Sequence, residues 1–222
     1  GVVERFTRMF SGVFYKRYIE GRWVQAQGII YDMFSEEHHV VPTVERNYDE
    51  YHIAMDYGTQ NPTAFILFGR VKDRKDPLDG KWVAIKEYYY EGRTAGRQKT
   101  DEEYYEDLEA FAGDLDITSL VIDPSASSFI VLARQRGRFY VRKAKNAVIV
   151  GIRNTATAIS GDMLFINDVC VNGLQEFHSY VWDEKAAQRG EDVPLKQSDH
   201  WLDALRYFVN TVMVRGGTSF MK

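Results

Sequence analysis

The stretch that decides the fold is an apolar run of β type that ends in a carboxylate, Tyr51-His-Ile-Ala-Met-Asp56-Tyr-Gly-Thr-Gln-Asn-Pro62. A second such run, about a third of the chain later, reads Ser119-Leu-Val-Ile-Asp123-Pro124. Short apolar runs that are bounded by turn formers predict buried strands. A carboxylate that ends a buried strand emerges at the edge of the sheet. We therefore expect Asp56 and Asp123 to lie at a sheet edge, where they can converge.

A third aspartate, Asp203, lies on a predicted late helix that reads Ser198-Asp-His-Trp-Leu-Asp203-Ala204. Three clustered carboxylates repel one another unless a divalent cation neutralises them, and hard cations such as Mg²⁺ and Mn²⁺ prefer oxygen ligands. The leading hypothesis is therefore a two-metal phosphodiester site that has Asp56, Asp123 and Asp203 as metal ligands. Each also has an ordinary explanation, because Asp56 and Asp123 can support turns and an aspartate on a helix is usually only solvated.

Two neighbours of Asp203 are ambiguous. Ser198 is the predicted N-cap of the late helix, and Asp199 in its first turn is favoured by the helix dipole, so Asp199 has a complete structural explanation. His200 lies three residues before Asp203 and can face either the metals or the core. The dipole at a helix N-terminus disfavours imidazolium, so we expect His200 to be neutral and able to ligate a metal or accept a proton. We include His200 among the catalytic candidates.

The composition bounds the class of protein. The chain has 222 residues, of which 45% are hydrophobic, enough for one sizeable core and an appendage. It has no apolar run of about 18 residues and no signal-peptide pattern, so we expect no membrane segment. Its only cysteine, Cys170, excludes an internal disulfide, which suits a reducing cytoplasm. The first residue is Gly1 rather than Met, so we expect a piece of a longer protein.

The charge distribution favours a phosphate-binding surface. The net charge is −4, but residues 124–161 contain no Asp or Glu. The basic residues of this segment are Arg134, Arg136, Arg138, Arg142, Lys143, Lys145 and Arg153. We interpret the segment, which directly follows Asp123, as a strip that faces DNA phosphates. The DNA-binding candidates are Arg142, Lys143, Lys145 and Arg153. The alternative is a solvated basic face.

The pattern of apolar residues predicts an α/β protein with a mixed sheet. Three successive strands joined by turns indicate an antiparallel meander, at 51–57, 63–72 and 82–90. A strand–helix–strand alternation then implies parallel pairing, at 120–122, 126–136 and 139–142. Further helices are expected at 2–20, 147–158, 174–181 and 199–214 and after the capping box Thr100-Asp-Glu-Glu103, with a strand at 163–166. Residues 1–45 are expected to be a lead-in outside the core, and the polar segment 183–197 an exposed loop or hairpin.

Other sequence signals bear on rival functions. The motif Asp56-Tyr-Gly-Thr59 also fits the phosphate loop of the actin and sugar-kinase ATPases, but those need two such domains and a second loop, and the chain offers neither. It has no Gly-x4-Gly-Lys-Ser/Thr loop, so it should not be a P-loop ATPase, and it has no Gly-x-Ser-x-Gly elbow. A zinc site is disfavoured, because the chain has one cysteine and its histidines are scattered as His38, His39, His52, His178 and His200.

Several motifs together resemble one known family. The segments Gly12-Val-Phe-Tyr-Lys-Arg-Tyr-Ile-Glu-Gly-Arg-Trp23-Val and Gly28-Ile-Ile-Tyr-Asp-Met-Phe34 resemble the linker of large terminase subunits from tailed bacteriophages, which joins a packaging ATPase to a C-terminal nuclease. The nuclease part is matched in order and spacing by the two strand motifs, by Tyr180-Val-Trp-Asp-Glu and by Asp199-His-Trp-Leu-Asp203-Ala-Leu-Arg-Tyr207. The match covers essentially the whole chain and resembles most the terminases of phages that infect Gram-positive bacteria.

The resemblance implies an RNase H-like fold, with a mixed central sheet flanked by helices, and a divalent-metal endonuclease that cuts concatemeric viral DNA at the start and end of head filling. It implies that Asp56, Asp123 and Asp203 are the catalytic acidic triad and bind two divalent cations, Mg²⁺ or Mn²⁺, with His200 beside them. Residues 1–45 correspond to the linker and residues 46–222 to the nuclease domain. The ATPase half is missing from the match, so we expect no ATPase activity of this chain.

The resemblance also implies partners and a place in the cell. The partners are double-stranded viral DNA, the small terminase subunit and the portal or procapsid, in the cytoplasm of the host cell and away from any membrane. Cleavage should be largely sequence-tolerant, because the basic strip would hold phosphates without reading bases. The segment 183–197 lies just ahead of the Asp203 helix and could gate the access of DNA.

Two competing hypotheses remain open at this point. One is a Holliday-junction resolvase or a transposase of the same fold, and a resolvase should be dimeric and prefer four-way junctions. The other is a DNA-binding or portal-docking module without catalysis, which should retain its activity after loss of the aspartates.

Overall fold

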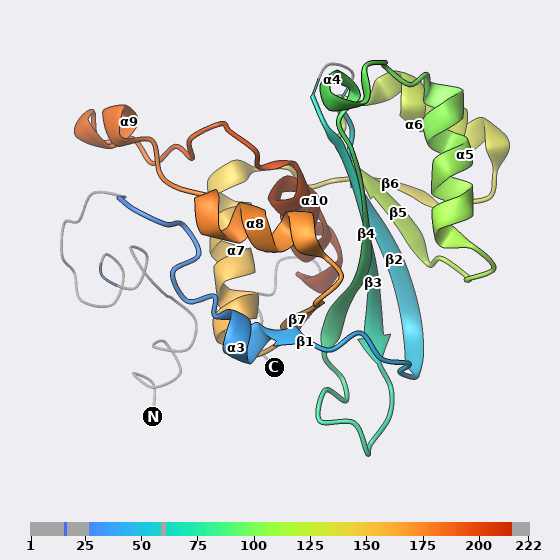
Figure 1. Cartoon of the computed structure of the whole chain (residues 1–222), viewed down its shortest axis with the longest axis horizontal. Helices are drawn as coiled ribbons and strands as arrows, with labels where there is room; N and C mark the ends of the chain where they lie inside the picture. Colours follow the sequence, from blue (N-terminus) through green and yellow to red (C-terminus); the bar gives the residue numbers. More distant parts are fainter. Residues whose placement is uncertain (1–15, 17–26, 59–60, 215–222) are drawn as a thin grey trace.

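A seven-stranded mixed sheet forms the centre of the computed structural model, which describes residues 16, 27–58 and 61–214. The strand order is β1-β7-β4-β3-β2-β5-β6, and helices cover both faces (Figure 1). Apart from Lys16, the helix expected over residues 2–20 lies outside the described residues. Within the part of the chain that is described, no helix is long and apolar enough to cross a membrane.

The middle of the sheet is the predicted antiparallel meander. Its strands are β2 (Tyr48–Asp56), β3 (Thr63–Val71) and β4 (Trp82–Tyr90). Successive side chains of a strand point to opposite faces. In β2, Ile53 and Met55 therefore pack into the core on one face, whereas Ala54 between them packs into the core on the other. The centre of the sheet is thus buried on both sides.

Parallel strands extend the meander at both edges. β5 (Ser119–Ile122) runs parallel to β2, and β6 (Val141–Lys143) runs parallel to β5. On the other side β7 (Leu164–Asn167) pairs in parallel with β4, and β1 (Val40–Val41) with β7. The antiparallel meander with parallel strands beside it confirms the predicted RNase H-like mixed sheet.

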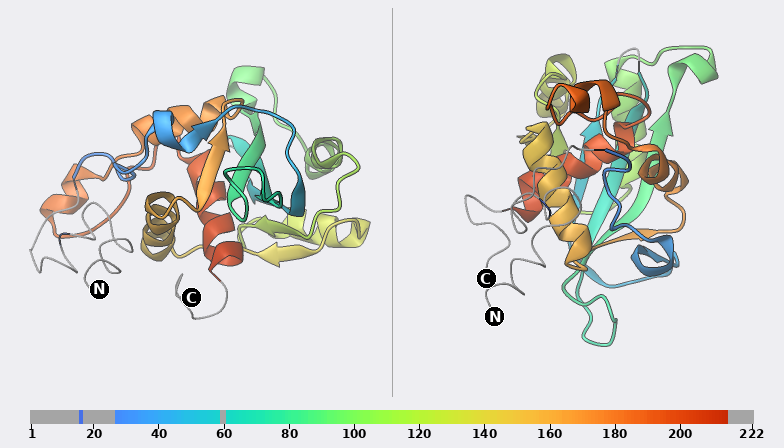
Figure 2. Two further views of the ribbon diagram at one scale, coloured as in Figure 1. Left: turned by 90° about the horizontal axis from the view of Figure 1, so that it is seen from below. Right: turned by 90° about the vertical axis from the view of Figure 1, so that its left-hand side faces the viewer.

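The helices form a layer on each face of the sheet (Figure 1). One layer consists of α5 (Asp101–Ala112) and α6 (Ser127–Arg136), and α5 begins at the predicted capping box on Thr100. The other consists of α7 (Val148–Ser160), α8 (Val171–Ser179) and α10 (His200–Phe208). Figure 2 shows α10, in red, between α7 and the strands, and α10 contacts both β2 and β3. The short helices are α3 (Glu36–His39), α4 (Gly92–Ala95) and α9 (Glu184–Gln188).

Two local predictions near the C-terminal end need refinement. The segment 183–197 is closed like a hairpin, since Trp182 pairs with Pro194 across it, but it also contains α9, which Asp183 caps through the N–H of Ala186 at 3.0 Å. The last helix covers the predicted range, but its α-helical part ends at Phe208 and a π-helical turn, η1 (Val209–Met213), continues it.

The lead-in is also not wholly outside the core. Ile30 and Tyr31 are buried against the α10 side of the sheet, and β1 becomes its edge strand. The division of the chain near residue 45 stays a prediction.

The tight packing of α10 depends on a glycine in α8. The indole of Trp201 is completely buried against Gly173, and a Cβ atom at this position would lie 2.4 Å from Cε2 of the indole. This contact brings α10 close to α8 and fixes the depth at which α10 lies on the sheet.

We predict that Gly173→Ala destabilises the protein by about 1–3 kcal/mol, because the added methyl group overlaps a buried ring that has no room to move. Helix propensity alone predicts the opposite sign, since alanine stabilises a helix by about 1 kcal/mol relative to glycine. Chemical denaturation measures the difference. Gln175→Ala, on the exposed face of the same helix, is the control and should change the stability little. Greater stability of Gly173→Ala would show that the contact with Trp201 is loose.

A carboxylate cleft at the end of the central strands

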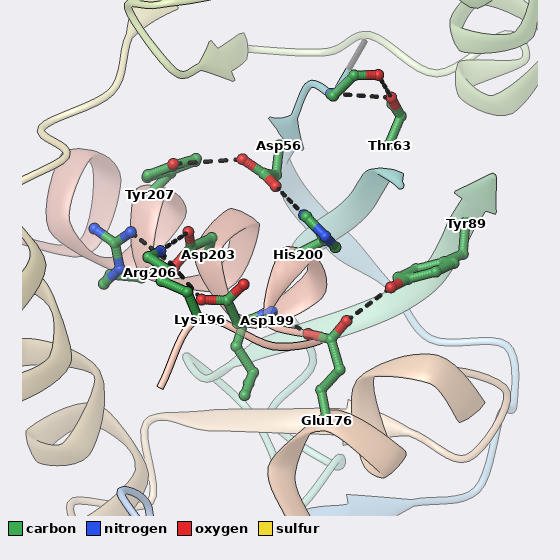
Figure 3. Close-up of polar contacts among 12 residues, drawn as sticks. Asp56, Thr63, Tyr89, Glu176, Lys196, Asp199, His200, Asp203, Arg206 and Tyr207 are labelled. Atoms are coloured by element: carbon green, nitrogen blue, oxygen red, sulfur yellow. Dashed lines mark hydrogen bonds and ion pairs between the residues drawn. The ribbon is translucent and has the colours of Figure 1, made fainter. Parts of the chain in front are cut away.

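The predicted aspartates lie close to the C-terminal ends of two inner strands of the sheet. Asp56 ends β2 and Asp123 directly follows β5, and the two strands are adjacent and parallel with Met55 opposite Ile122. Asp203 is on α10, which packs on β2 and β3. A cleft of about 410 Å³ opens between Asp56 and Asp203 (Figure 3). Its lining comprises Asp56, Tyr57, Gly58, Asn61, Lys196, Gln197, Ser198, Asp199, His200 and Asp203.

Asp56 is held by two side chains of α10. The Nδ1 atom of His200 lies 2.9 Å from Oδ2 of Asp56, and the hydroxyl of Tyr207 donates to Oδ1 at 3.4 Å. Burial raises the pKa of Asp56, although the hydrogen bond with His200 acts in the opposite direction. For His200, desolvation favours the neutral form, but the bond to the Asp56 carboxylate outweighs it and raises the pKa. The carboxylate at contact distance thus acts against the helix dipole, and the expectation that His200 is neutral stays a prediction.

Asp203 lies between two cations. Its Oδ1 accepts a hydrogen bond from Nη2 of Arg206 at 2.8 Å, and its Oδ2 accepts one from Nζ of Lys196 at 3.2 Å. Arg206 is buried, and its Nη1 also donates to the backbone oxygen of Asn146 at 2.9 Å. Both oxygens of Asp203 are therefore fixed in direction, as Figure 3 shows.

Asp199 faces the cleft rather than the helix backbone. Its Oδ2 accepts a hydrogen bond from Nζ of Lys196 at 3.1 Å, and its side chain makes no capping bond although it occupies the N-cap position. Ser198, the predicted cap, has a φ of 49° and does not cap the helix either. The capping part of the prediction is therefore wrong, since neither Ser198 nor Asp199 caps α10 with its side chain, and Asp199 joins the group of cleft carboxylates.

The missing cap is supplied from another helix. Oε2 of Glu176 in α8 accepts a hydrogen bond from the backbone N–H of Leu202 at 3.0 Å, where an N-cap side chain would normally bind. Its Oε1 accepts one from the hydroxyl of Tyr89 in β4 at 3.1 Å. Burial raises the pKa of Glu176 to about 8. Glu176 thus fixes the start of α10 and leaves the carboxylate of Asp199 available to the cleft.

Asp123 lies at the margin of this cleft. The backbone N–H of Ser125 donates to its Oδ1 at 2.7 Å, which is the turn-forming contact expected from the sequence. The side chain of Asn146 donates to its Oδ2 at 3.3 Å. Partial burial opposes ionisation, but the hydrogen bonds from Ser125, Tyr207 and Asn146 together lower the pKa of Asp123. Tyr207 therefore lies between Asp56 and Asp123.

The triad is spread out rather than compact. Among the described residues, a group of three or more possible ligands whose atoms all lie within 4.8 Å of one another occurs at His38, His39 and Asp162, and Asp56, Asp123 and Asp203 do not form such a group. The structure brings Asp56 and Asp203 into one cleft and places Asp123 beside it.

The predicted basic strip is divided between two sides of the domain. Lys143 and Lys145 are exposed, and Lys145 immediately precedes the asparagine that contacts Asp123. Part of the guanidinium group of Arg142 is used within the domain, since its Nη2 donates to the backbone oxygen of Thr211 at 2.8 Å. Arg153 is half-buried on α7. Arg136 instead pairs with Glu102 on α5.

Four residues that contact the aspartates or hold their helix in place were not predicted from the sequence. Arg206 and Tyr207 follow Asp203 by three and four residues and share its helix face, so the helical period could have identified them. Lys196 lies in an irregular segment and Glu176 on a different helix, and no local pattern links either residue to Asp203.

Comparisons with solved structures show which proteins share this fold. The large terminase of a thermophilic bacteriophage, solved in complex with ADP, is 55% identical and gives a TM-score of 0.90 over 96% of this chain and 52% of that one. The nuclease domain of the P22 large terminase gives a TM-score of 0.63 at 18% identity, over 82% of this chain and 91% of that chain. The nuclease domain of the phage SPP1 large terminase, with bound manganese, gives 0.52 at 16% identity over 81% and 97%. No protein-family profile and no curated protein matches.

The topology and the carboxylate cleft define an RNase H-like α/β domain of the kind found in phage terminase nucleases. The chain is similar to bacteriophage large terminases, at 55% identity to one of them, and it shares the fold of their nuclease domains. It spans about half the length of the terminase that was solved with ADP.

We predict that Glu176 makes the stability depend on pH. Its pKa is about 8 in the folded protein but about 4.3 in an unfolded chain. Its contribution to stability is therefore fully present below the unfolded value and is lost as the pH rises through the folded value. Glu176→Gln imitates the neutral carboxyl group. Between pH 6 and pH 9 the melting temperature of this variant should fall less than that of the wild type, by roughly 3 °C or more.

Differential scanning fluorimetry at several pH values measures this difference. Glu106→Gln, at an exposed position of α5, is the matched control and should follow the wild-type profile. The same profile for Glu176→Gln and the wild type would mean that Glu176 is ionised throughout this range.

Proposed function

We propose that this domain is a metal-dependent endonuclease that cuts concatemeric double-stranded viral DNA during genome packaging. The observation that carries the proposal is the gathering of Asp56, Asp199 and Asp203 in one cleft at the edge of the central sheet, with Asp123 beside it. The terminase relationship supplies the context for this chemistry.

The donor set fits hard divalent cations. Asp56, Asp123 and Asp203 offer only carboxylate oxygens, which Mg²⁺ and Mn²⁺ prefer. Each of the three carboxylates also has polar neighbours. Asp56 and Asp203 in the cleft, with Asp123 beside it, would together hold two such ions. When bound, such ions activate a water molecule and stabilise the leaving oxygen of the phosphodiester. The related nuclease domains of phages SPP1 and G20c have been solved with bound manganese and magnesium.

The side chains around the carboxylates have positioning roles. His200 orients Asp56 through its Nδ1 atom, and Arg206 orients Asp203 from the buried side. Burial lowers the pKa of Lys196, but the charges of Asp203 and Asp199 outweigh this and raise it, so its ammonium group stays charged. Lys196 is more than half exposed and can turn from the carboxylates towards a phosphate of the substrate.

The remaining assignments also belong to this proposal. Arg142, Lys143, Lys145 and Arg153 hold DNA phosphates without reading bases, which makes cleavage sequence-tolerant. In the complete protein the residues up to about 45 connect this domain to a packaging ATPase. The small terminase subunit and the portal or procapsid are its partners, and it acts in the cytoplasm of the host cell.

We predict that the chain nicks or degrades plasmid DNA with Mn²⁺ or Mg²⁺ and that EDTA stops the reaction. Asp56→Asn, Asp123→Asn and Asp203→Asn should each reduce the rate at least about a hundredfold, because each removes a charged ligand without changing the shape of the side chain. Asp114→Asn, on an exposed loop, is the matched control and should cleave like the wild type. Cleavage in the presence of chelator would contradict the metal mechanism, and full activity of the three variants would contradict the site.

We also predict that the basic surface binds duplex DNA with little regard to sequence. Replacing Lys143, Lys145 and Arg153 together with Ala should weaken binding to unrelated duplexes alike. It should also reduce the slope of log affinity against log salt by about 0.9 for each lost phosphate contact. Fluorescence anisotropy at several salt concentrations measures both effects.

Arg136→Ala is the control for this experiment, because Arg136 pairs with Glu102 on the other side of the domain. Loss of affinity for one duplex alone would instead mean that the mutated residues read bases.

A further inference from the structure

A second group of possible metal ligands lies at the opposite end of the strands from the carboxylate cleft. His38 and His39 end α3, and Asp162 lies in the turn between α7 and β7. The strands β2, β4 and β7 all run in the same direction. Asp56 is at the end of β2, whereas Asp162 precedes the start of β7, so the two groups lie at opposite ends of the strands. Figure 1 shows α3 beside the start of β1 and near β7, away from the N-terminus of α10.

The ligand atoms of this group are close together. Nε2 of His38 lies 2.7 Å from Oδ1 of Asp162, and Nε2 of His39 lies 3.8 Å from the same oxygen. All three ligand atoms lie within 4.8 Å of one another. Zinc bonds of about 2.0–2.2 Å in tetrahedral geometry separate the ligand atoms by about 3.4 Å. The two observed distances fall on either side of this value, so side-chain shifts of less than about 1 Å would complete the geometry.

Backbone groups contact both ring nitrogens of His39. The ring is buried, and its Nδ1 accepts a hydrogen bond from the backbone N–H of Ser35 at 3.1 Å and lies 3.2 Å from the backbone oxygen of the same residue. Its Nε2 lies 3.2 Å from the backbone oxygen of Ile159, so without a metal the proton is on Nε2. Metal binding requires the other tautomer, in which Nδ1 donates to the oxygen of Ser35 and the lone pair of Nε2, 3.8 Å from Oδ1 of Asp162, is free to ligate.

The other two members are accessible to solvent. The side chains of His38 and Asp162 are 58% and 53% exposed, so a metal ion can reach them and keep a water molecule as a further ligand. The ordinary explanation is an ion pair between His38 and Asp162, with His39 bonded to backbone groups. What a three-ligand site explains in addition is that the second imidazole lies 3.8 Å from the same carboxylate oxygen. The sequence argued against zinc because the histidines are scattered, but the fold brings Asp162 to two histidines more than a hundred residues earlier.

We propose that His38, His39 and Asp162 form a binding site for a transition-metal ion of the zinc class, with an open position towards solvent. Two imidazoles and one carboxylate suit Zn²⁺, Co²⁺ or Ni²⁺, whereas Mg²⁺ prefers the oxygen ligands of the cleft. A metal here would tie α3 and β1 to the turn before β7. It would thereby fix the segment that leads into the domain, independently of the nuclease activity.

The test is a titration of the complete 222-residue chain, without an affinity tag, with Zn²⁺ by calorimetry and with Co²⁺ by visible absorption. Saturating Mg²⁺ is present throughout, so that the carboxylate cleft is occupied. We expect one equivalent of Zn²⁺ to bind and to raise the melting temperature, and Co²⁺ to give the intense absorption of four-coordinate cobalt. His38→Ala and Asp162→Asn should each weaken binding at least about tenfold.

Both variants change exposed side chains, and their melting temperatures without added metal show whether they fold. His178→Ala is the matched control, because His178 is an equally exposed histidine that pairs with Glu36 outside the group. Binding that is unaffected by His38→Ala and Asp162→Asn, or only the weak spectrum of six-coordinate cobalt, would overturn the proposal. Absence of any Zn²⁺ binding would leave a simple ion pair and would overturn it equally.

Discussion

The carboxylate cleft depends on one buried guanidinium group, that of Arg206. It is 2% exposed and donates both to Asp203 and to the backbone oxygen of Asn146. A buried charge that lost such partners would cost several kcal/mol, so these contacts fix α10 against the loop after β6. The side chain of Asn146 in turn donates to Asp123. Arg206 thereby connects Asp203 directly, and Asp123 through Asn146. Gly151 leaves the necessary space, because a Cβ atom there would lie 2.5 Å from Cγ of Arg206.

A second constraint is the way in which the start of α10 is satisfied. The first N–H groups of any helix need acceptors, and an N-cap side chain usually provides one. Here a buried carboxylate on α8, Glu176, accepts from Leu202 instead, while the N-cap residue Asp199 turns towards Lys196. The helix is therefore stabilised without using a carboxylate of the cleft. The cost is a buried carboxyl group, whose pKa is raised by desolvation although a backbone N–H stabilises its charge.

Most elements of the fold were predictable because their signals are local. The apolar runs that end at Asp56 and Asp123 became adjacent parallel strands, and the capping box at Thr100 begins α5. The errors have two sources. β1 has only two residues and exists because β7 offers it an edge, so its own sequence carries no strand signal. α9 forms through its cap at Asp183, which is a local signal in a segment whose polarity suggested a loop.

The sequence by itself determined the fold class and identified Asp56, Asp123, Asp203 and His200 as candidate site residues. It could do so because the end of a strand and the spacing along a helix are both visible in residues close together in the chain. Only the tertiary structure decided their surroundings. It gave Asp56 a histidine partner, freed Asp199 from the helix backbone, and brought distant groups such as Lys196 and Glu176 to the same helix end. The physical reason is that charge, burial and pKa depend on which groups lie within a few ångströms in space, and separation along the chain does not encode that distance.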